Sequence, residues 1–251
     1  LLSRRQRQMC IRDSPQVELL KALKATGKPV ILILTAGRPL ALTETEPLAD
    51  AILYTWSLGD QAGRAMADVV FGDVNPSARL STSFPRNVGQ CPIYYNHKNT
   101  GRPHQDGAAY SRFNSNYLDC IHGPLYAFGH GLSYTTFEYS DVTLSNNEMT
   151  ADGQVKASVT VTNTGKRDGK EVVQLYVRDI YATSSRPVKE LKGFEKISLK
   201  AGESKTVSFE IGRKQLEYYN HALQLTVEPG DFEIMIGHDS QHVNKAKLTV
   251  N

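Results

Sequence analysis

The stretch GPLYAFGHGLSYTTFEYSDVTL, residues 123–144, decides how the fold of this chain is interpreted, because the sequence pattern differs on its two sides. Before it, long apolar runs alternate with helix-like segments. After it come short segments with two-residue alternation, separated by turn residues. Its glycines allow backbone conformations that other residues rarely adopt, but its many aromatic and aliphatic residues are too apolar for a flexible linker. We predict a packed joint between two domains at residues 123–135, with a buried hairpin or strand inside one domain as the alternative.

The N-terminal side begins with the signals of a short amphipathic helix. Ser14 and Pro15 are typical of a helix start, and Gly27 is typical of a helix end. Residues 30–34, VILIL, are apolar at every position, as expected of a strand covered on both faces in a parallel sheet. A helix, a turn and a buried strand in this order indicate an α/β structure.

A second buried strand is expected at residues 49–56, followed by a helix that Asp60 caps and that ends at Gly72. Two parallel strands cannot cover each other, since a stable parallel sheet needs more strands and helices on both faces. We therefore interpret residues 15–122 as the C-terminal part of a larger α/β domain. Apolar surface should be exposed in it around the isoleucines of the two strands, Ile31, Ile33 and Ile52.

The C-terminal side has the two-residue period of half-buried β-strands. Residues 155–161 and 173–177 alternate apolar with polar side chains, and shorter alternating runs follow at 207–211, 223–227 and 232–236. Six or seven short antiparallel strands predict an immunoglobulin-like or fibronectin type III-like β-sandwich over residues 136–251. The predicted fold class is α/β plus all-β: a partial α/β domain with a parallel sheet, then a β-sandwich.

Composition narrows the function classes. The chain has 251 residues and a formal charge of +3. The segment 1–14 alone supplies that excess, since it contains four arginines and one aspartate. The remainder is neutral and has no basic stripe, which argues against nucleic acid as a partner. No apolar run approaches the ~18 residues of a membrane span. The sequence leaves the oligomeric state open.

Residues 1–14 and the cysteines carry no recognisable function. The first fourteen residues lack the apolar core of a secretory signal and show no periodicity, so we predict a foreign or disordered tail, with a native basic arm as the alternative. Cys10, Cys91 and Cys120 are odd in number and irregularly spaced. They indicate neither a disulfide framework nor a metal site, although pairing of Cys91 with Cys120 stays open.

No set of titratable residues has the spacing of a known catalytic or metal site. Four aspartates near the second strand are explained as caps and turn residues, namely Asp50, Asp60, Asp68 and Asp73. Glu44 and Glu46 lie on a polar connection and are expected to be solvated. Trp56, at the end of a strand, is expected in the core rather than on a sugar. The histidines are scattered through turns and strand ends, so no metal ligand and no cofactor is predicted.

Six ungapped motifs, in order, carry a resemblance to a known family. They are KPVILILTAGRPLAL (28–42), ADAILYTWSLGDQAGRAMADVVFG (49–72), NPSARLSTSFP (75–85), LYAFGHGLSYTTF (125–137), VTVTNTG (159–165) and PVKELKGF (187–194). The chain resembles the C-terminal half of glycoside hydrolase family 3, and within it the bacterial periplasmic β-glucosidases. One departure is Gly129-His130-Gly131, where the family has Gly-Tyr-Gly.

The resemblance implies a barrel, an α/β sandwich domain and a fibronectin type III-like domain, of which this chain holds the last part. It implies a retaining β-glucosidase or β-xylosidase that acts on β-linked glucosides or oligosaccharides in the periplasm or outside the cell. In that family the nucleophilic aspartate and the acid/base glutamate precede the segment matched here, so none of this chain's residues is expected to be catalytic. The chain alone should be inactive, and carbohydrate would bind mainly to the missing barrel.

The polar loop YYNHKNTGR, residues 94–102, is the candidate contact with substrate or barrel. Asn96, His97, Lys98 and Arg102 offer hydrogen-bond donors beside two tyrosines, which suits a sugar-contacting or domain-contacting surface. The alternative function is a free-standing β-sandwich that acts as a spacer or as an adaptor for carbohydrate surfaces. The incomplete α/β part favours the enzyme fragment, because a separate module would not keep two uncovered strands.

Overall fold

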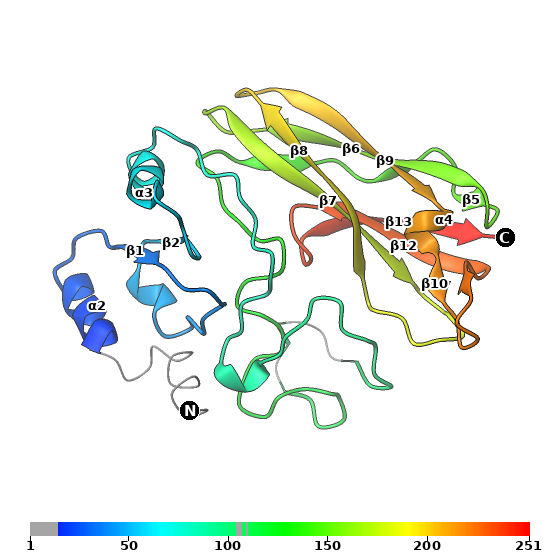
Figure 1. Ribbon diagram of the computed structural model, residues 1–251, viewed down its shortest axis with the longest axis horizontal. Helices are drawn as coiled ribbons and strands as arrows, with labels where there is room; N and C mark the ends of the chain where they lie inside the picture. The colour runs from blue at the N-terminus through cyan, green and yellow to red at the C-terminus, as the bar shows by residue number, and fades with distance from the viewer. Residues whose placement is uncertain (1–14, 104–106, 109) are drawn as a thin grey trace. The chain divides into compact units, whose positions relative to one another are not determined.

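The computed structural model describes residues 15–103, 107–108 and 110–251 (Figure 1). The predictions for residues 1–14, which include the Ser14 cap, lie outside the described residues. The chain divides into two compact units. One comprises Leu1–Val74, Thr82–Tyr94 and Arg102–Ala127, and the other comprises Asn75–Ser81, Tyr95–Gly101 and Phe128–Asn251. The domain boundaries at residues 122/123 and 135/136 stay predictions.

The first unit has the helices and the parallel strand pair that the sequence predicts. Its elements are α2 (Pro15–Ala25), β1 (Ile31–Leu34), the 3-10 helix η1 (Glu46–Leu48), β2 (Ala51–Tyr54), α3 (Ala62–Val70) and the 3-10 helix η2 (Val88–Gln90). β1 and β2 are parallel, with Ile31 opposite Ala51 and Leu34 opposite Tyr54. The expected cap of α3 is wrong, because Gln61 occupies the N-cap position, without a side-chain capping bond, in place of Asp60.

The sheet of the first unit exposes apolar side chains on one face. Ile31 is 50% exposed and Ile33 is 43% exposed, whereas the strand neighbours between and after them are half-buried. Ile52 is half-buried, so the prediction of exposure holds for two of its three residues. In the described residues this sheet has two strands only. An open apolar face is what strands show when further elements normally cover them.

Replacing Ile31 and Ile33 together by threonine should reduce the fluorescence of a hydrophobic dye bound to the chain. Threonine keeps the β-branched shape that suits a strand and removes apolar surface from water. The melting temperature should change little, because both side chains are already largely exposed. Leu42→Thr, at a side chain only 1% exposed, is the matched buried control and should destabilise the unit. Unchanged dye fluorescence in the double variant would show that this face is not the exposed apolar surface.

The second unit is a β-sandwich with short additional elements. Its strands are β3 (Phe137–Tyr139), β4 (Thr143–Leu144), β5 (Glu148–Met149), β6 (Gln154–Asn163), β7 (Gly169–Asp179), β8 (Glu190–Leu199), β9 (Ser204–Gly212), β10 (Tyr218–Tyr219), β11 (Leu225–Thr226), β12 (Gly230–Gly237) and β13 (Val243–Val250), and its helix is α4 (Arg213–Leu216). One sheet has the order β5-β13-β12-β7-β8. The other joins β3, β4 and β9 to β6.

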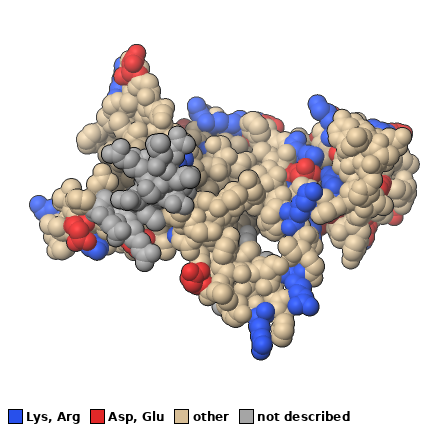
Figure 2. Space-filling model, turned by 60° about the horizontal axis from the view of Figure 1, so that its bottom comes forward, with Lys and Arg blue, Asp and Glu red and all other residues tan. Residues whose placement is uncertain are grey.

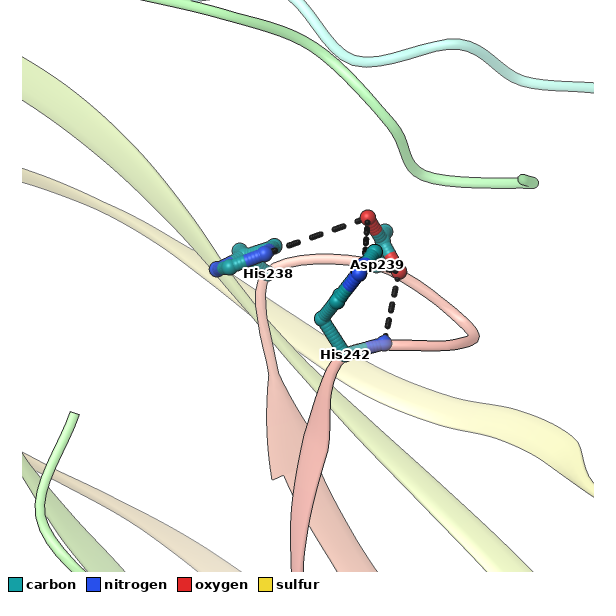
Figure 3. Close-up of side chains that lie close together, drawn as sticks. All are labelled: His238, Asp239 and His242. Atoms are coloured by element: carbon teal, nitrogen blue, oxygen red, sulfur yellow. Dashed lines mark hydrogen bonds and ion pairs between the residues drawn. The ribbon is translucent and has the colours of Figure 1, made fainter. Parts of the chain in front are cut away.

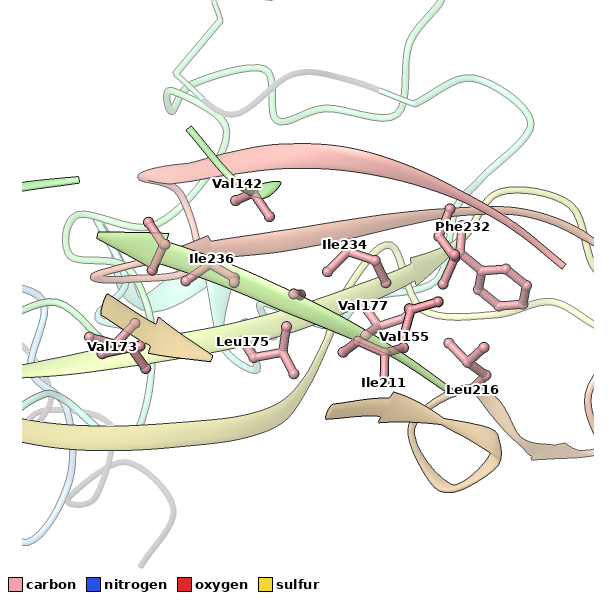
Figure 4. Close-up of a cluster of buried hydrophobic side chains, with 14 of the residues drawn as sticks. Val142, Val155, Val173, Leu175, Val177, Ile211, Leu216, Phe232, Ile234 and Ile236 are labelled. Carbon is pink, nitrogen blue, oxygen red and sulfur yellow. The ribbon is translucent and has the colours of Figure 1, made fainter. Parts of the chain in front are cut away.

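Alternating side chains of the two sheets form the core (Figure 4). In β6 every second residue from Val155 onward is buried, while the residues between are exposed or half-buried. β7 and β12 contribute Leu175 and Ile234 to the same cluster. In β6 one face is therefore buried and the other is open to water, whereas in the middle of β7 and β12 both faces are buried, as Tyr176 and Met235 show. The fibronectin type III-like sandwich predicted from the sequence is therefore confirmed.

Two details of the sandwich differ from the predicted strands. The strand expected at residues 223–227 is reduced to Leu225–Thr226, because Leu223 lies in a turn with φ of 59° and an exposed side chain. β8 and β13, by contrast, are full strands of this unit for which no strand was predicted. β13 does alternate at Ala246, Leu248 and Val250. The signal was present in the sequence, between charged residues that obscure it.

Two segments that precede the sandwich in sequence belong to its unit. In Asn75–Ser81, the backbone of Leu80 forms two hydrogen bonds with Gly129 and His130: its amide donates to the carbonyl of His130 and its carbonyl accepts from the amide of Gly129, both at 2.8 Å. Gly129 has φ of 84° there, a conformation that favours glycine. In Tyr95–Gly101, the ring of Tyr95 stacks on Phe128 with centroids 4.2 Å apart.

Candidate functional site

The predicted polar loop divides between the two units. Asn96, His97 and Lys98 are exposed and lie beside the segment that leads into β8: the carbonyl of His97 accepts a hydrogen bond from the amide of Val188 at 2.9 Å. Lys98 forms an isolated antiparallel bridge with the neighbouring proline. Arg102 belongs to the first unit, where its carbonyl accepts from the amide of Ser115. The structure thus groups three of the four residues, and their contact with substrate or barrel stays a prediction.

The aspartates near the parallel strands have structural roles. The carboxylate of Asp50 accepts hydrogen bonds from Lys24 Nζ at 2.9 Å and from the amide of Val30 at 2.8 Å, which joins α2 to the start of β1. The bond from Lys24, followed by that from Val30, lowers the pKa of Asp50. A general acid at neutral pH needs a raised pKa, so Asp50 is unsuited to that role. Asp60 and Asp73 are exposed, and Asp68 lies 4.0 Å from Arg64 on α3.

The carboxyl end of β1 and the turn that follows it border a hollow in the first unit. Its volume is 660 Å³, and Thr35, Gly37 and Arg38 are among the residues that line it. Ligands of open α/β sheets bind at this end of the strands. Trp56 follows β2 with φ of 54° and packs edge-on against Tyr54, with centroids 5.0 Å apart. The half-buried ring is part of an aromatic cluster around the buried Phe84, which favours the interpretation of Trp56 as a core residue.

A buried ion pair fixes Asn75–Ser81 to the sandwich. Arg79 donates from Nη2 to Glu171 on β7 and from Nη1 to the carbonyl of Gly131. Glu171 also accepts from the hydroxyl of Tyr139 at 2.7 Å. Burial raises the pKa of Glu171, and the facing guanidinium partly offsets this effect. Sequence reasoning did not identify this network, because its members are far apart along the chain and follow no local pattern.

One group of side chains in the described residues has the arrangement of metal ligands. His238, Asp239 and His242 place one ligand atom each within 4.8 Å of one another. Burial alone would raise the pKa of Asp239, but hydrogen bonds from His130, His242 and the backbone outweigh it and hold the pKa below its usual range. The sequence signal is short: two histidines four positions apart with an aspartate between them. Cys91 and Cys120 are free thiols.

A second group of buried charges should make stability depend on pH. Burial raises the pKa of Asp179 to about 6 from its ordinary 3.8, although Arg186, 3.9 Å away, lowers it in part. Between about pH 4 and 6 the folded chain then keeps a proton that the unfolded chain has lost, so the free energy of unfolding should fall as the pH rises.

Urea unfolding at pH 4.5 and pH 7 measures this effect, and Asp179→Asn is the diagnostic variant. We expect the variant to lose much of the pH-dependent fall and to keep the part that Glu171 contributes. The same fall in the variant and in the unaltered chain would contradict the assignment to Asp179.

Comparison with known families settles the relationship. Residues 6–134 match the glycosyl hydrolase family 3 C-terminal domain, and residues 171–240 match a fibronectin type III-like domain. The chain belongs to glycosyl hydrolase family 3. The resemblance stated from the sequence is confirmed.

Characterised relatives in glycosyl hydrolase family 3 are much longer than this chain. A periplasmic β-glucosidase of Salmonella typhimurium is 56% identical over 93% of the chain, and a β-xylosidase of Formosa agariphila is 48% identical over 90%. The chain spans 30% of the length of each. A crystal structure of the Listeria innocua β-glucosidase with gluconolactone superposes with a TM-score of 0.89 at 43% identity, and the matched part is 32% of that chain.

Proposed function

We propose that this chain is the C-terminal part of a retaining β-glycosidase, a β-glucosidase or β-xylosidase, and that it scaffolds a catalytic centre whose carboxylates lie outside it. The observation that supports this most directly is the identity of 56% to a periplasmic β-glucosidase of which the chain spans only 30%. The two relatives named above differ in sugar, so the proposal covers both glucosides and xylosides.

The proposed chemistry requires two carboxyl groups about 5–5.5 Å apart. One attacks the anomeric carbon and forms a glycosyl-enzyme intermediate. The other protonates the departing oxygen and then removes a proton from the water that releases the sugar. The carboxylates near the parallel strands do not suit these roles, because Asp50 is held ionised by Lys24 and other members of the set are exposed on turns.

The chain's own contribution would be to shape the surroundings of that centre. The hollow at the carboxyl end of β1, with Arg38 on its wall, is the candidate ligand-facing surface of the first unit. Asn96, His97 and Lys98 on the second unit and Arg102 on the first are the candidate contacts with substrate or barrel. In the upstream-extended protein, substituting any of these four by alanine should raise KM more than it lowers kcat. A contact made equally in the ground state and in the transition state contributes to substrate binding and not to the chemical step.

The proposed location is the periplasm or the cell exterior, because the Salmonella relative is named a periplasmic β-glucosidase. Among the described residues, no helix combines the length and the hydropathy needed to cross a bilayer. On the face drawn in Figure 2, charged side chains of both signs stand in small separate groups. This distribution supports an uncharged partner such as carbohydrate over nucleic acid, which would require a basic surface.

The test is to express the coding sequence together with its upstream extension and to assay aryl β-glucosides and β-xylosides. We expect hydrolysis of at least one of them, with the β-anomer released first when the reaction is followed by proton NMR. Release of the α-anomer first would contradict the retaining mechanism. Absence of hydrolysis on both substrates by a folded, extended protein would contradict the proposed substrate class.

A further inference from the structure

The loop between β12 and β13 fixes a buried carboxylate at one end of the sandwich (Figure 3). The side chain of Asp239 is fully buried. Its Oδ1 atom accepts hydrogen bonds from the amides of Gln241 and His242, each at 2.8 Å. His242 Nδ1 also lies 3.0 Å from Oδ1, and the other oxygen, Oδ2, lies near the imidazoles beside it.

Imidazole nitrogens of three histidines lie close to that second oxygen. Asp239 Oδ2 is 2.9 Å from His242 Nδ1, 3.9 Å from His238 Nε2 and 3.7 Å from His130 Nδ1. Figure 3 shows the side chains of His238 and His242 drawn together on the same loop as Asp239, with interactions between each histidine and the carboxylate. A buried carboxylate is costly without a positive partner, and a bound cation would supply one.

We propose that His238 Nε2, Asp239 Oδ2 and His242 Nδ1 form a binding site for a divalent transition-metal ion of the zinc class. Ligand atoms at 2.0–2.1 Å from a tetrahedral ion lie about 3.3 Å from one another. The two distances between these nitrogens and the carboxylate oxygen, 2.9 and 3.9 Å, bracket that value. Small rotations of the two imidazoles would satisfy the coordination.

Groups that would orient the ligating carboxylate are already in place. Oδ1 of Asp239 is fixed by two amides, and His130 interacts with the same carboxylate from outside the group of three. Such outer hydrogen bonds orient ligating carboxylates in metal sites. His238 and His242 are 40% and 64% exposed, so an ion can enter from solvent and water can fill the remaining positions.

The loop backbone is held in place by bonds from other segments of the second unit. Gln174 Nε2 donates to the carbonyl of His238 at 2.5 Å, and the amide of Ser240 donates to the carbonyl of Phe128 at 2.9 Å. At the end of β12, a Cβ on Gly237 would overlap the carbonyl oxygen of His242. The close approach that this glycine permits brings His242 to the carboxylate. The ligands are thus positioned before an ion binds, which lowers the entropy cost of binding.

The donor set selects the class of ion. Two imidazoles and one carboxylate suit Zn²⁺, Co²⁺, Ni²⁺ and Cu²⁺, whereas Mg²⁺ and Ca²⁺ prefer oxygen ligands. An ion at this place would connect the two ends of the loop between β12 and β13. Because it binds only the folded loop, it should raise the melting temperature, and the stabilisation should grow with the logarithm of the ion concentration once that concentration exceeds Kd.

The test is titration of the full chain with zinc chloride in a calorimeter, combined with thermal unfolding with and without zinc. His238→Ala/His242→Ala is the diagnostic variant, and both side chains are exposed enough for the fold to survive. His97→Ala/His221→Ala, at two exposed histidines of the same unit, is the matched control. Circular dichroism verifies that both variants are folded.

We expect the unaltered chain and the control to bind zinc at one common site and to melt at a higher temperature in its presence. The diagnostic variant should bind that ion at least about tenfold more weakly, a difference of ~1.4 kcal/mol, and show no rise in melting temperature. Equal binding by all three proteins, or no binding at millimolar zinc, would overturn the proposal. Because the assay measures binding and not hydrolysis, its outcome is independent of the proposed glycosidase function.

Discussion

Replacing Arg79 by methionine should lower the free energy of unfolding of the second unit by ~3–5 kcal/mol, because the substitution leaves Glu171 as a buried charge without its partner. The two side chains are 13% and 1% exposed. Methionine fills a similar volume, so the loss is electrostatic rather than a cavity effect. Urea unfolding followed by tyrosine fluorescence measures this loss of unfolding free energy.

Arg178→Met is the matched control: this arginine pairs with Glu233 at 3.4 Å at a partly exposed site, and the loss should be below about 1 kcal/mol.

The double variant Arg79→Met/Glu171→Leu separates the charge effect from packing. With both charges removed, much of the lost stability should return, since a buried ion pair replaced by apolar groups of similar size is often nearly neutral. The hydroxyl of Tyr139 would lose its acceptor, so part of the loss in unfolding free energy should remain. A loss below about 1 kcal/mol in Arg79→Met, or no recovery in the double variant, would show that the pair does not carry the stability assigned to it.

Truncation of Phe232 to alanine should destabilise the sandwich by ~3–5 kcal/mol, since it removes a large apolar side chain and leaves a cavity. Phe232 lies on β12 within the core cluster and is 1% exposed. Phe194→Ala is the matched control, because that ring on β8 is 67% exposed, and it should cost less than about 0.5 kcal/mol. Equal losses at the two positions would contradict the core assignment.

Much of the sandwich could be predicted from the sequence because its signal is local. The two-residue alternation of β6 and β7 predicts which side chains face the core, and those residues are buried in the structure. In β7 the alternation does not show that Gln174 and Tyr176, on the other face, are buried too. The parallel pairing of β1 with β2 was likewise implied by two runs that are apolar at nearly every position. Propensity and period decide such features without reference to distant parts of the chain.

The features missed from the sequence depend on contacts between distant residues. Arg79 and Glu171 are 92 positions apart, and nothing near either one indicates a partner. The grouping of His130 with the His238–His242 loop has the same cause. The turn at Leu223, with its left-handed backbone, overrode an alternating pattern that would otherwise indicate a strand.

The membership of Asn75–Ser81 in the second unit alters one expectation about folding. From the sequence alone, a sandwich that begins near Thr136 is expected to fold independently, since it carries its own alternating core. Such a piece keeps the cluster of Figure 4 but loses Arg79 and leaves Glu171 unpaired. We therefore expect it to melt cooperatively at a lower temperature than the second unit melts in the full chain. Glu171→Leu in the excised piece should restore part of the difference.

Whether the chain holds a catalytic carboxylate can be measured by hydrolysis of an aryl β-glucoside by the purified 251-residue chain, in parallel with the upstream-extended protein at equal concentration. We expect the chain, although folded, to release no aglycone above the buffer blank, whereas the extended protein does. Release by the chain that persists after repeated purification, and that disappears when one of its own aspartates or glutamates is replaced, would place a catalytic carboxylate within these residues and contradict the account.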